Sequence, residues 1–232
     1  MVELKKEFWE KFYSQDDGHV MYPHEEIIRF FSTYIRKRVD LAKFVDKCHF
    51  EPIPRVLDIG CGRGRHVVFS SELGLDIHAI DLSEEAIKLT KKWLETKNIQ
   101  VDDSKVVTSS VTDMPWANDY FDFAISHGVF DSMYFDIAKQ GMAEASRVIK
   151  KGGLFYIDLV SGDDSMHSKE YSDDEVVTTA HEYGTVQSYY NYSKINTLIS
   201  HYFEIKEIFL IKKINVHSGD FISRWHLVLK NL

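Results

Sequence analysis

Apolar and polar positions follow two different patterns along this chain of 232 residues. Before residue 50, apolar side chains recur at helical spacing, which predicts helices over residues 3–14 and about 24–47. From residue 55 onward, short apolar runs alternate with helical patterns, and this alternation predicts an α/β fold with a parallel sheet. The runs that predict its strands are 55–59, 75–80, 105–108, 120–126 and 154–160.

The last third of the chain has a different pattern. Residues 161–171 are polar and predict a mobile loop. Two β-type runs then flank a turn at Tyr183-Gly184, which predicts a hairpin inserted at about 172–192. A short helix is predicted from Ser193 to about His201, and two long strand patterns follow it, over 203–212 and 222–230.

Candidate chemistry concentrates in one stretch, Val56-Leu57-Asp58-Ile59-Gly60-Cys61-Gly62-Arg63-Gly64, where an apolar strand runs into a glycine turn. Glycines let a backbone approach a ligand closely, and the N–H groups of the following helix face such a turn. A dinucleotide fingerprint has the spacing G-x-G-x-x-G, whereas this turn has G-x-G-x-G after an acid. Asp58 would repel a pyrophosphate but would accept hydrogen bonds from an ammonium group. We therefore expect a ligand with a cation at this end and adenosine at the other.

This stretch resembles the first motif of the class I S-adenosylmethionine-dependent methyltransferases, of the small-molecule type with a methyltransferase domain 11/25-like core. Further matches follow in the family's order: Asp81 ends the second strand, Asp113 precedes Met114-Pro115, and the fourth strand begins with an aromatic-Asp entry at Phe121-Asp122. Arg147–Gly153 is similar to the family's turn before the fifth strand, with Lys151 in place of the usual proline. The resemblance covers roughly 55–160 well and 200–230 moderately.

The resemblance implies a doubly wound, Rossmann-like sheet of seven strands, mostly parallel with an antiparallel C-terminal strand. The chain is then one domain over 1–232, in which 1–50 form a helical N-terminal cover and 51–232 form the core with the inserted hairpin. Substrate contacts in the family often come from such additions.

The resemblance also implies the residues that bind S-adenosylmethionine and its product S-adenosylhomocysteine. Asp58 would accept the ammonium, Asp81 the ribose hydroxyls and Asp113 the adenine amino group. The full cofactor-binding set is Asp58, Gly60, Cys61, Gly62, Gly64, Asp81, Leu82, Thr112, Asp113, Met114, Ser126 and His127.

Three residues are candidates for catalysis. His127 lies at the carboxyl end of a strand, where an imidazole faces the ligand crevice and can act as a general base. The same side chain equally fits a packing or substrate-shaping role, because the aromatic or His pair that many small methyltransferases carry is here Phe130-Asp131. Tyr13 and Tyr22 fit either a core or a cover over the methyl group. His226 lies in a strand pattern and is assigned no chemistry, and no Cys/His spacing fits a zinc site.

The composition limits the kinds of partner and the cellular location that we expect for the protein. The net charge of −8 lacks the basic footprint of nucleic-acid binders. Only Cys48 and Cys61 are present, too few for a disulfide framework, and no run of about 18 apolar residues predicts a membrane span. Together with the absence of a signal-peptide pattern, this predicts a cytoplasmic protein, monomeric or homodimeric, that acts on a small molecule without nucleic acid, membrane or metal.

The leading interpretation is a methyltransferase (EC 2.1.1.-) that transfers a methyl group to an oxygen or nitrogen of a small molecule. Two alternatives stay open at this point. One is a nicotinamide-dependent oxidoreductase, which Asp58 and the glycine spacing disfavour. The other is a non-catalytic module that binds the nucleoside.

Overall fold

The computed structural model describes residues 2–14, 20–165, 173–177 and 184–232. Its centre is a sheet of seven strands in the order β10-β11-β7-β6-β3-β4-β5. Neighbours from β7 to β5 pair in parallel, whereas β11 is antiparallel to both β7 and β10. The expected doubly wound, mostly parallel sheet with a reversed C-terminal strand is therefore confirmed. The strands are β3 (Arg55–Ile59), β4 (Asp76–Asp81), β5 (Val106–Thr108), β6 (Phe121–Ser126), β7 (Ile149–Val160), β10 (Phe203–Ile214) and β11 (Phe221–Asn231).

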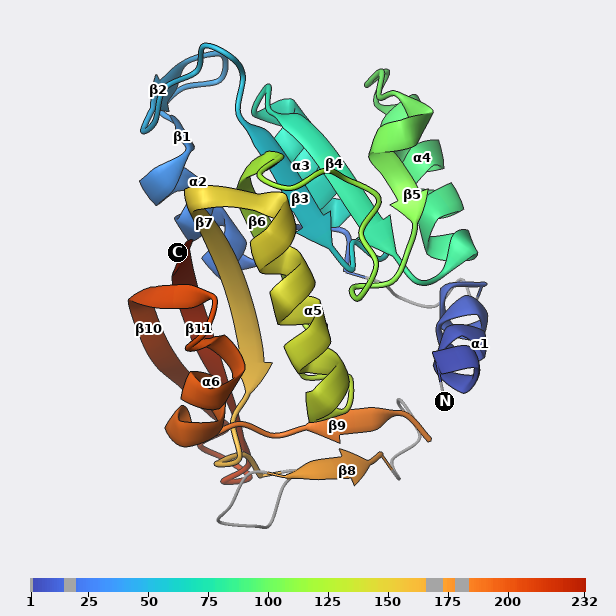
Figure 1. Ribbon diagram of the computed structural model, residues 1–232, viewed down its shortest axis with the longest axis vertical. Helices are drawn as coiled ribbons and strands as arrows, with labels where there is room; N and C mark the ends of the chain where they lie inside the picture. The colour runs from blue at the N-terminus through green and yellow to red at the C-terminus, as the bar shows by residue number, and fades with distance from the viewer. Residues whose placement is uncertain (1, 15–19, 166–172, 178–183) are drawn as a thin grey trace.

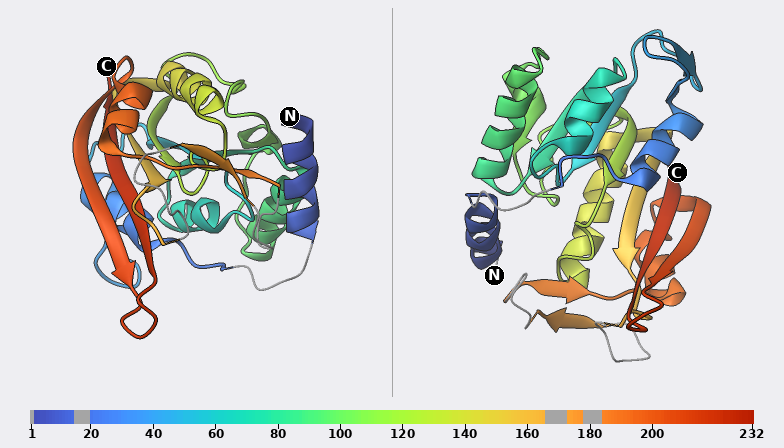
Figure 2. Two further views of the ribbon diagram at one scale, coloured as in Figure 1. Left: turned by 90° about the horizontal axis from the view of Figure 1, so that it is seen from below. Right: turned by 180° about the vertical axis from the view of Figure 1, so that it is seen from behind.

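Helices cover both faces of the sheet (Figure 1). One face carries α5 (Phe135–Val148) and α6 (Tyr192–Ile199), and Figure 2 shows α2 (Glu25–Tyr34), α3 (Arg65–Glu72) and α4 (Glu84–Thr96) on the other. Each face has its own buried apolar cluster. Because side chains alternate along a strand, Leu57 packs with the α5 face and Val56 with the α2–α3 face. Asp58 is on the same side of the sheet as Val56 by this alternation.

The helix predicted over 24–47 is wrong in its second half. α2 ends at Tyr34, and β1 (Arg36–Arg38) and β2 (Phe44–Asp46) pair as a small antiparallel hairpin. The N-terminal cover over 1–50, which was expected to be helical, therefore also contains two strands. The cause lies in the sequence, because after Ile35 the apolar stripe stops and Leu41 is 92% exposed. Arg36 instead holds the hairpin, with its guanidinium over the Phe50 ring at 3.7 Å.

The inserted region contains β8 (Asp174–Val176) and β9 (Val186–Ser188), which pair antiparallel. They cross below the lower end of α5 in Figure 1, at the edge where the parallel strands end. The predicted loop over 161–171 and the turn at Tyr183-Gly184 lie partly outside the described residues. None of the helices in the described ranges is long and apolar enough to cross a membrane.

α1 (Val2–Ser14) stands apart from the sheet, beside the start of α4 (Figures 1 and 2). Glu10 accepts hydrogen bonds from the backbone N–H groups of Glu84 and Glu85, which caps α4 from outside. Lys6 pairs with Glu84 at 2.7 Å. These contacts hold α1 at the carboxyl end of β4, next to the glycine turn.

Candidate functional site

The glycine turn connects β3 to α3 through three residues with positive φ, namely Gly60 at 74°, Gly62 at 54° and Gly64 at 83°. The turn is tied to β4, because the N–H groups of Gly60 and Cys61 both donate to the Ile80 carbonyl, at 2.8 and 2.9 Å. Any side chain at Gly60 would collide with Val129, since an added Cβ would lie 2.3 Å from a Val129 methyl carbon. The turn therefore requires glycine for its conformation and for its close packing.

Asp58 is buried beside this turn without a hydrogen-bond partner. Its side chain is 1% exposed, and neither carboxylate oxygen has a hydrogen-bond partner among the residues that the structure describes. Burial raises the pKa of Asp58 to about 8, a rise that the positive charge of Arg65 opposes and the negative charge of Asp81 increases. Unpaired buried carboxylates are costly, so this side chain is suited to a cation supplied by a ligand.

Asp81 ends β4 and accepts two backbone hydrogen bonds. Its oxygens receive the N–H of Gly62 at 2.8 Å and the N–H of Ser83 at 2.9 Å. Burial raises the pKa of Asp81 to about 6 against the effect of these donors. Each oxygen keeps a further lone pair, which is what a ribose hydroxyl requires.

The remaining predicted binding residues are spread over four places. Cys61 is buried in the turn and Leu82 is half-buried after β4. Asp113 is exposed on the loop after β5, whereas Thr112 shares a hydrogen bond with Ser110 and the Met114 N–H donates to Glu144. Ser126 is buried and its hydroxyl donates to the Ile59 carbonyl at 3.0 Å, so it joins β6 to β3.

The two tyrosine candidates have different environments. The Tyr13 hydroxyl lies over the glycine turn, 2.8 Å from where a Cβ on Gly62 would be. Arg63 fixes this end of α1 by donating to the Tyr13 carbonyl at 2.9 Å. Tyr22 is 81% exposed, so the structure does not bring it into a wall of the site.

His127 belongs to a cluster of four imidazoles from four separate elements. The ring centroid of His24 lies 4.2 Å from that of His127 and 5.9 Å from that of His226, and the rings of His66 and His127 are 5.8 Å apart. The cluster adjoins Asp58, because His66 Nδ1 is 4.0 Å from an Asp58 oxygen. No group of three or more potential ligands in the described ranges is arranged to hold a metal ion.

A buried network of charged side chains, formed by Asp131, Asp158 and Arg224, lies next to His127 of this cluster. Asp158 accepts hydrogen bonds from the Gly128 N–H and from Arg224 Nε, each at 2.7 Å, and Arg224 also pairs with Asp131. Although burial alone would raise the pKa of Asp158, the Arg224 charge holds it below the ordinary range. His127 Nε2 is 3.5 Å from this carboxylate. Burial lowers the pKa of His127 to about 4, so the imidazole is neutral at pH 7, as a general base must be.

Four site residues were not predicted from the sequence, namely His24, His66, Asp158 and Arg224, and His226 was assigned no chemistry. They come from four distant segments, and no local spacing connects them. A signal was nevertheless present in Asp158, a carboxylate inside the otherwise apolar fifth strand near its carboxyl end.

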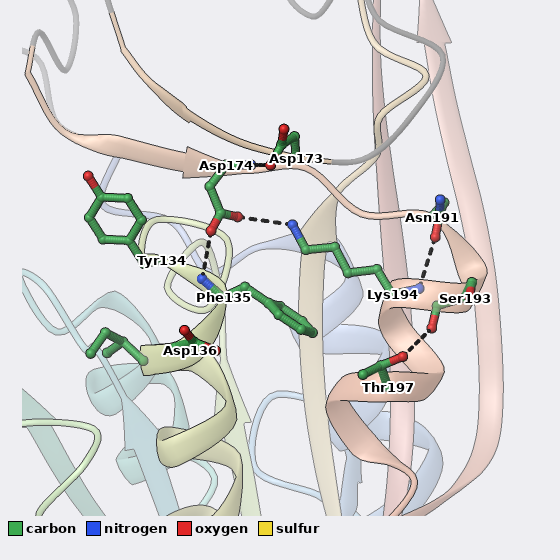
Figure 3. Close-up of a pocket in the computed structure, with 10 residues that line it drawn as sticks. Tyr134, Phe135, Asp136, Asp173, Asp174, Asn191, Ser193, Lys194 and Thr197 are labelled. Atoms are coloured by element: carbon green, nitrogen blue, oxygen red, sulfur yellow. Dashed lines mark hydrogen bonds and ion pairs between the residues drawn. The ribbon is translucent and has the colours of Figure 1, made fainter.

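A pocket of about 770 Å³ lies away from these residues, between the start of α5, β8 and α6 (Figure 3). Asp174 accepts from the Phe135 N–H at 2.9 Å and pairs with Lys194 at 3.0 Å across it. None of the predicted site residues lines this pocket. Its polar contacts hold the β8–β9 hairpin against α5 and α6.

A family model described as a methyltransferase domain matches residues 57–157. A probable S-adenosyl-L-methionine-dependent methyltransferase TehB from Haemophilus influenzae is 32% identical over 94 residues, which are 40% of this chain and 29% of that protein. The sterol 4-C-methyltransferase strm-1 of Caenorhabditis elegans is 23% identical over 60% of this chain and 39% of its own length. The chain thus spans less than half of the length of these curated relatives.

Solved structures share the fold. A SAM-dependent methyltransferase from Methanosarcina mazei superimposes with a TM-score of 0.63 at 19% identity, over 78% of this chain and 93% of that one. The crystal structure of TehB from Haemophilus influenzae gives 0.60 at 15% identity, over 98% of this chain and 67% of that one. The arrangement of strands and helices around the glycine turn is therefore common to these proteins.

The first prediction concerns the stability cost of Asp58. Its folded pKa of about 8 lies above the ordinary value of about 4, so the folded state binds a proton more tightly. The free energy of unfolding should fall as pH rises from about 4 to about 8. Asp58→Asn should remove this fall, and its free energy of unfolding at pH 9 should be at least about 1 kcal/mol higher than that of the parent. Urea unfolding at pH 5 and pH 9 measures it, with the exposed Asp113→Asn as control; equal pH dependence in parent and Asp58→Asn would contradict it.

The second prediction concerns the contact of α1 with the turn. Gly62→Ala should lower the free energy of unfolding by about 1 kcal/mol for the left-handed backbone, plus the cost of displacing the Tyr13 hydroxyl. Gly128→Ala is the matched control, because its φ is 69° and nothing lies within 4 Å of an added Cβ. Gly62→Ala should lower the free energy of unfolding more than Gly128→Ala does. This difference between the two variants should be smaller when Tyr13→Phe is also present. A difference that Tyr13→Phe leaves unchanged would refute the contact.

Proposed function

Since the chain belongs to the class I S-adenosylmethionine-dependent methyltransferase family, we propose that it binds S-adenosylmethionine along the glycine turn and methylates an oxygen or nitrogen of a small molecule. The observation that carries this proposal is Asp58, a buried carboxylate with two unpartnered oxygens beside a turn that only glycines can form. An ammonium group is the complement of such a carboxylate. A pyrophosphate is not, which disfavours a nicotinamide dinucleotide.

The residues of the chain fit the nucleoside. Asp58 would take the ammonium of the methionine moiety, and Asp81 would accept from the ribose hydroxyls. Asp113 would accept from the adenine amino group, and its exposure leaves its carboxylate available. The turn between them supplies a close approach of backbone, with Tyr13 above Gly62.

The sulfonium supplies a methyl carbon with a neutral leaving group. The chain's own task is then to orient the acceptor, exclude water and remove a proton where the acceptor enters protonated. The S–CH₃ bond would break as a bond from that carbon to the acceptor oxygen or nitrogen forms. The acceptor's proton would pass to His127 once its Nδ1, which contacts Arg65 at 3.2 Å, is free. Asp158 would hold the resulting imidazolium, since its carboxylate already faces His127 Nε2.

A small-molecule acceptor is favoured by charge and by the enclosing elements. The net charge of −8 disfavours nucleic acid. The cluster consists of His24 before α2, His66 in α3, His127 after β6 and His226 in β11, so an acceptor there would meet side chains from four segments. We place the acceptor at this cluster.

The third prediction tests the ligand. S-adenosylhomocysteine should bind, and Asp58→Ala should weaken binding about 10- to 150-fold because a charged hydrogen bond contributes roughly 1.5–3 kcal/mol. Titration calorimetry at pH 8 measures both, with Asp122→Ala as a matched loss of a strand carboxylate, paired with Lys150 and away from the turn. Binding of NADH in place of S-adenosylhomocysteine would overturn the assignment. Release of S-adenosylhomocysteine across a panel of small acceptors then tests turnover.

A further inference from the structure

Arg65 is a cation in the site, and none of the described carboxylates forms an ion pair with it. It is the first residue of α3, directly after Gly64. In the described part of the chain its guanidinium has one polar partner, His127 Nδ1 at 3.2 Å. Arg224, by contrast, is paired with two acids, Asp131 and Asp158. An arginine left without an acid beside a ligand site is available for an anionic group of the ligand.

Arg65 and Asp58 act on the same small region. The charge of Arg65 is the largest one that acts on the Asp58 carboxyl, yet the two side chains form no ion pair with each other. A group that carries both an ammonium and a carboxylate on one carbon could pair its ammonium with Asp58 and its carboxylate with Arg65. The α-amino-acid end of the proposed nucleoside is such a group.

The contact with Arg65 also determines the state of His127. A guanidinium has donors only, so His127 Nδ1 must accept and the ring proton must be on Nε2. Nε2 faces Asp158 at 3.5 Å. Nε2 forms no hydrogen bond among the described residues, so its contact with the Asp158 carboxylate is electrostatic. The lone pair on Nδ1, which would take a proton from the acceptor, is covered by Arg65.

We propose that Arg65 binds the carboxylate of the methionine moiety, opposite Asp58, and that its turn toward this carboxylate uncovers His127 Nδ1. Arg65 is then a binding residue for the nucleoside and a positioning residue for the base. The base becomes available only after the nucleoside is bound, so the nucleoside binds before a protonated acceptor can react. This inference rests on the proposed function, from which its test is separable.

The test compares ligands that differ only in the carboxylate. S-adenosylhomocysteine and decarboxylated S-adenosylhomocysteine are titrated by calorimetry into the parent, Arg65→Met, Arg65→Lys and Arg63→Met. Arg65→Met should weaken S-adenosylhomocysteine about 10- to 100-fold and leave the decarboxylated ligand unchanged, and Arg65→Lys should recover part of the loss. Arg63→Met is the matched control, because its guanidinium donates to the Tyr13 carbonyl, and it should affect both ligands equally.

Equal weakening of both ligands by Arg65→Met would overturn the carboxylate contact. So would unchanged binding of both with a raised KM for an anionic acceptor, which would assign Arg65 to the acceptor. Failure of the parent to bind either ligand contradicts the proposed function instead. Nitrogen-15 NMR of the imidazoles tests the uncovering: the Nδ1 resonance of His127 should shift on S-adenosylhomocysteine binding in the parent and should already be shifted in free Arg65→Met. A resonance that moves in neither case would refute it.

Discussion

The site depends on one unfavourable burial, the Asp58 carboxylate. Its oxygens have no partner, and the nearby His66 Nδ1 at 4.0 Å is too distant for a hydrogen bond. A group of this kind persists in a fold because it contributes to binding rather than to stability. The positive charge of Arg65 acts on this carboxylate, and His66 joins it to the imidazole cluster. A ligand cation bound at Asp58 would therefore change the electrostatics of the cluster.

The rest of the fold holds this carboxylate in place. β3 delivers Asp58 and the glycine turn to the carboxyl edge of the sheet, and β4 fixes the turn through the Ile80 carbonyl and Asp81. α1 then covers the turn through Tyr13, with Glu10 anchored on α4. α1 lies outside the central sheet, and its place over the turn is where a cover that excludes water from the proposed reacting centre would act.

Local patterns predicted what depends on neighbours in sequence. Short motifs predicted the strands, the glycine turn, Asp58 and Asp81. The structure places the turn and the two acids at the edge formed by the carboxyl ends of the parallel strands. The hairpin at 36–46 was missed because a helix was extended past Ile35, where the apolar stripe ends. The imidazole cluster was missed because His24, His66, His127 and His226 meet only through tertiary folding.

The number of protons released on ligand binding reports the ionisation of Asp58. S-adenosylhomocysteine is titrated into the protein at pH 7 in buffers of different ionisation enthalpy, with 5′-methylthioadenosine, which lacks the ammonium, as the comparison ligand. With a pKa of about 8, Asp58 is largely protonated at pH 7, and pairing with the ammonium should ionise it. We expect release of close to one proton with S-adenosylhomocysteine and none with 5′-methylthioadenosine. Equal proton release with the two ligands would contradict it.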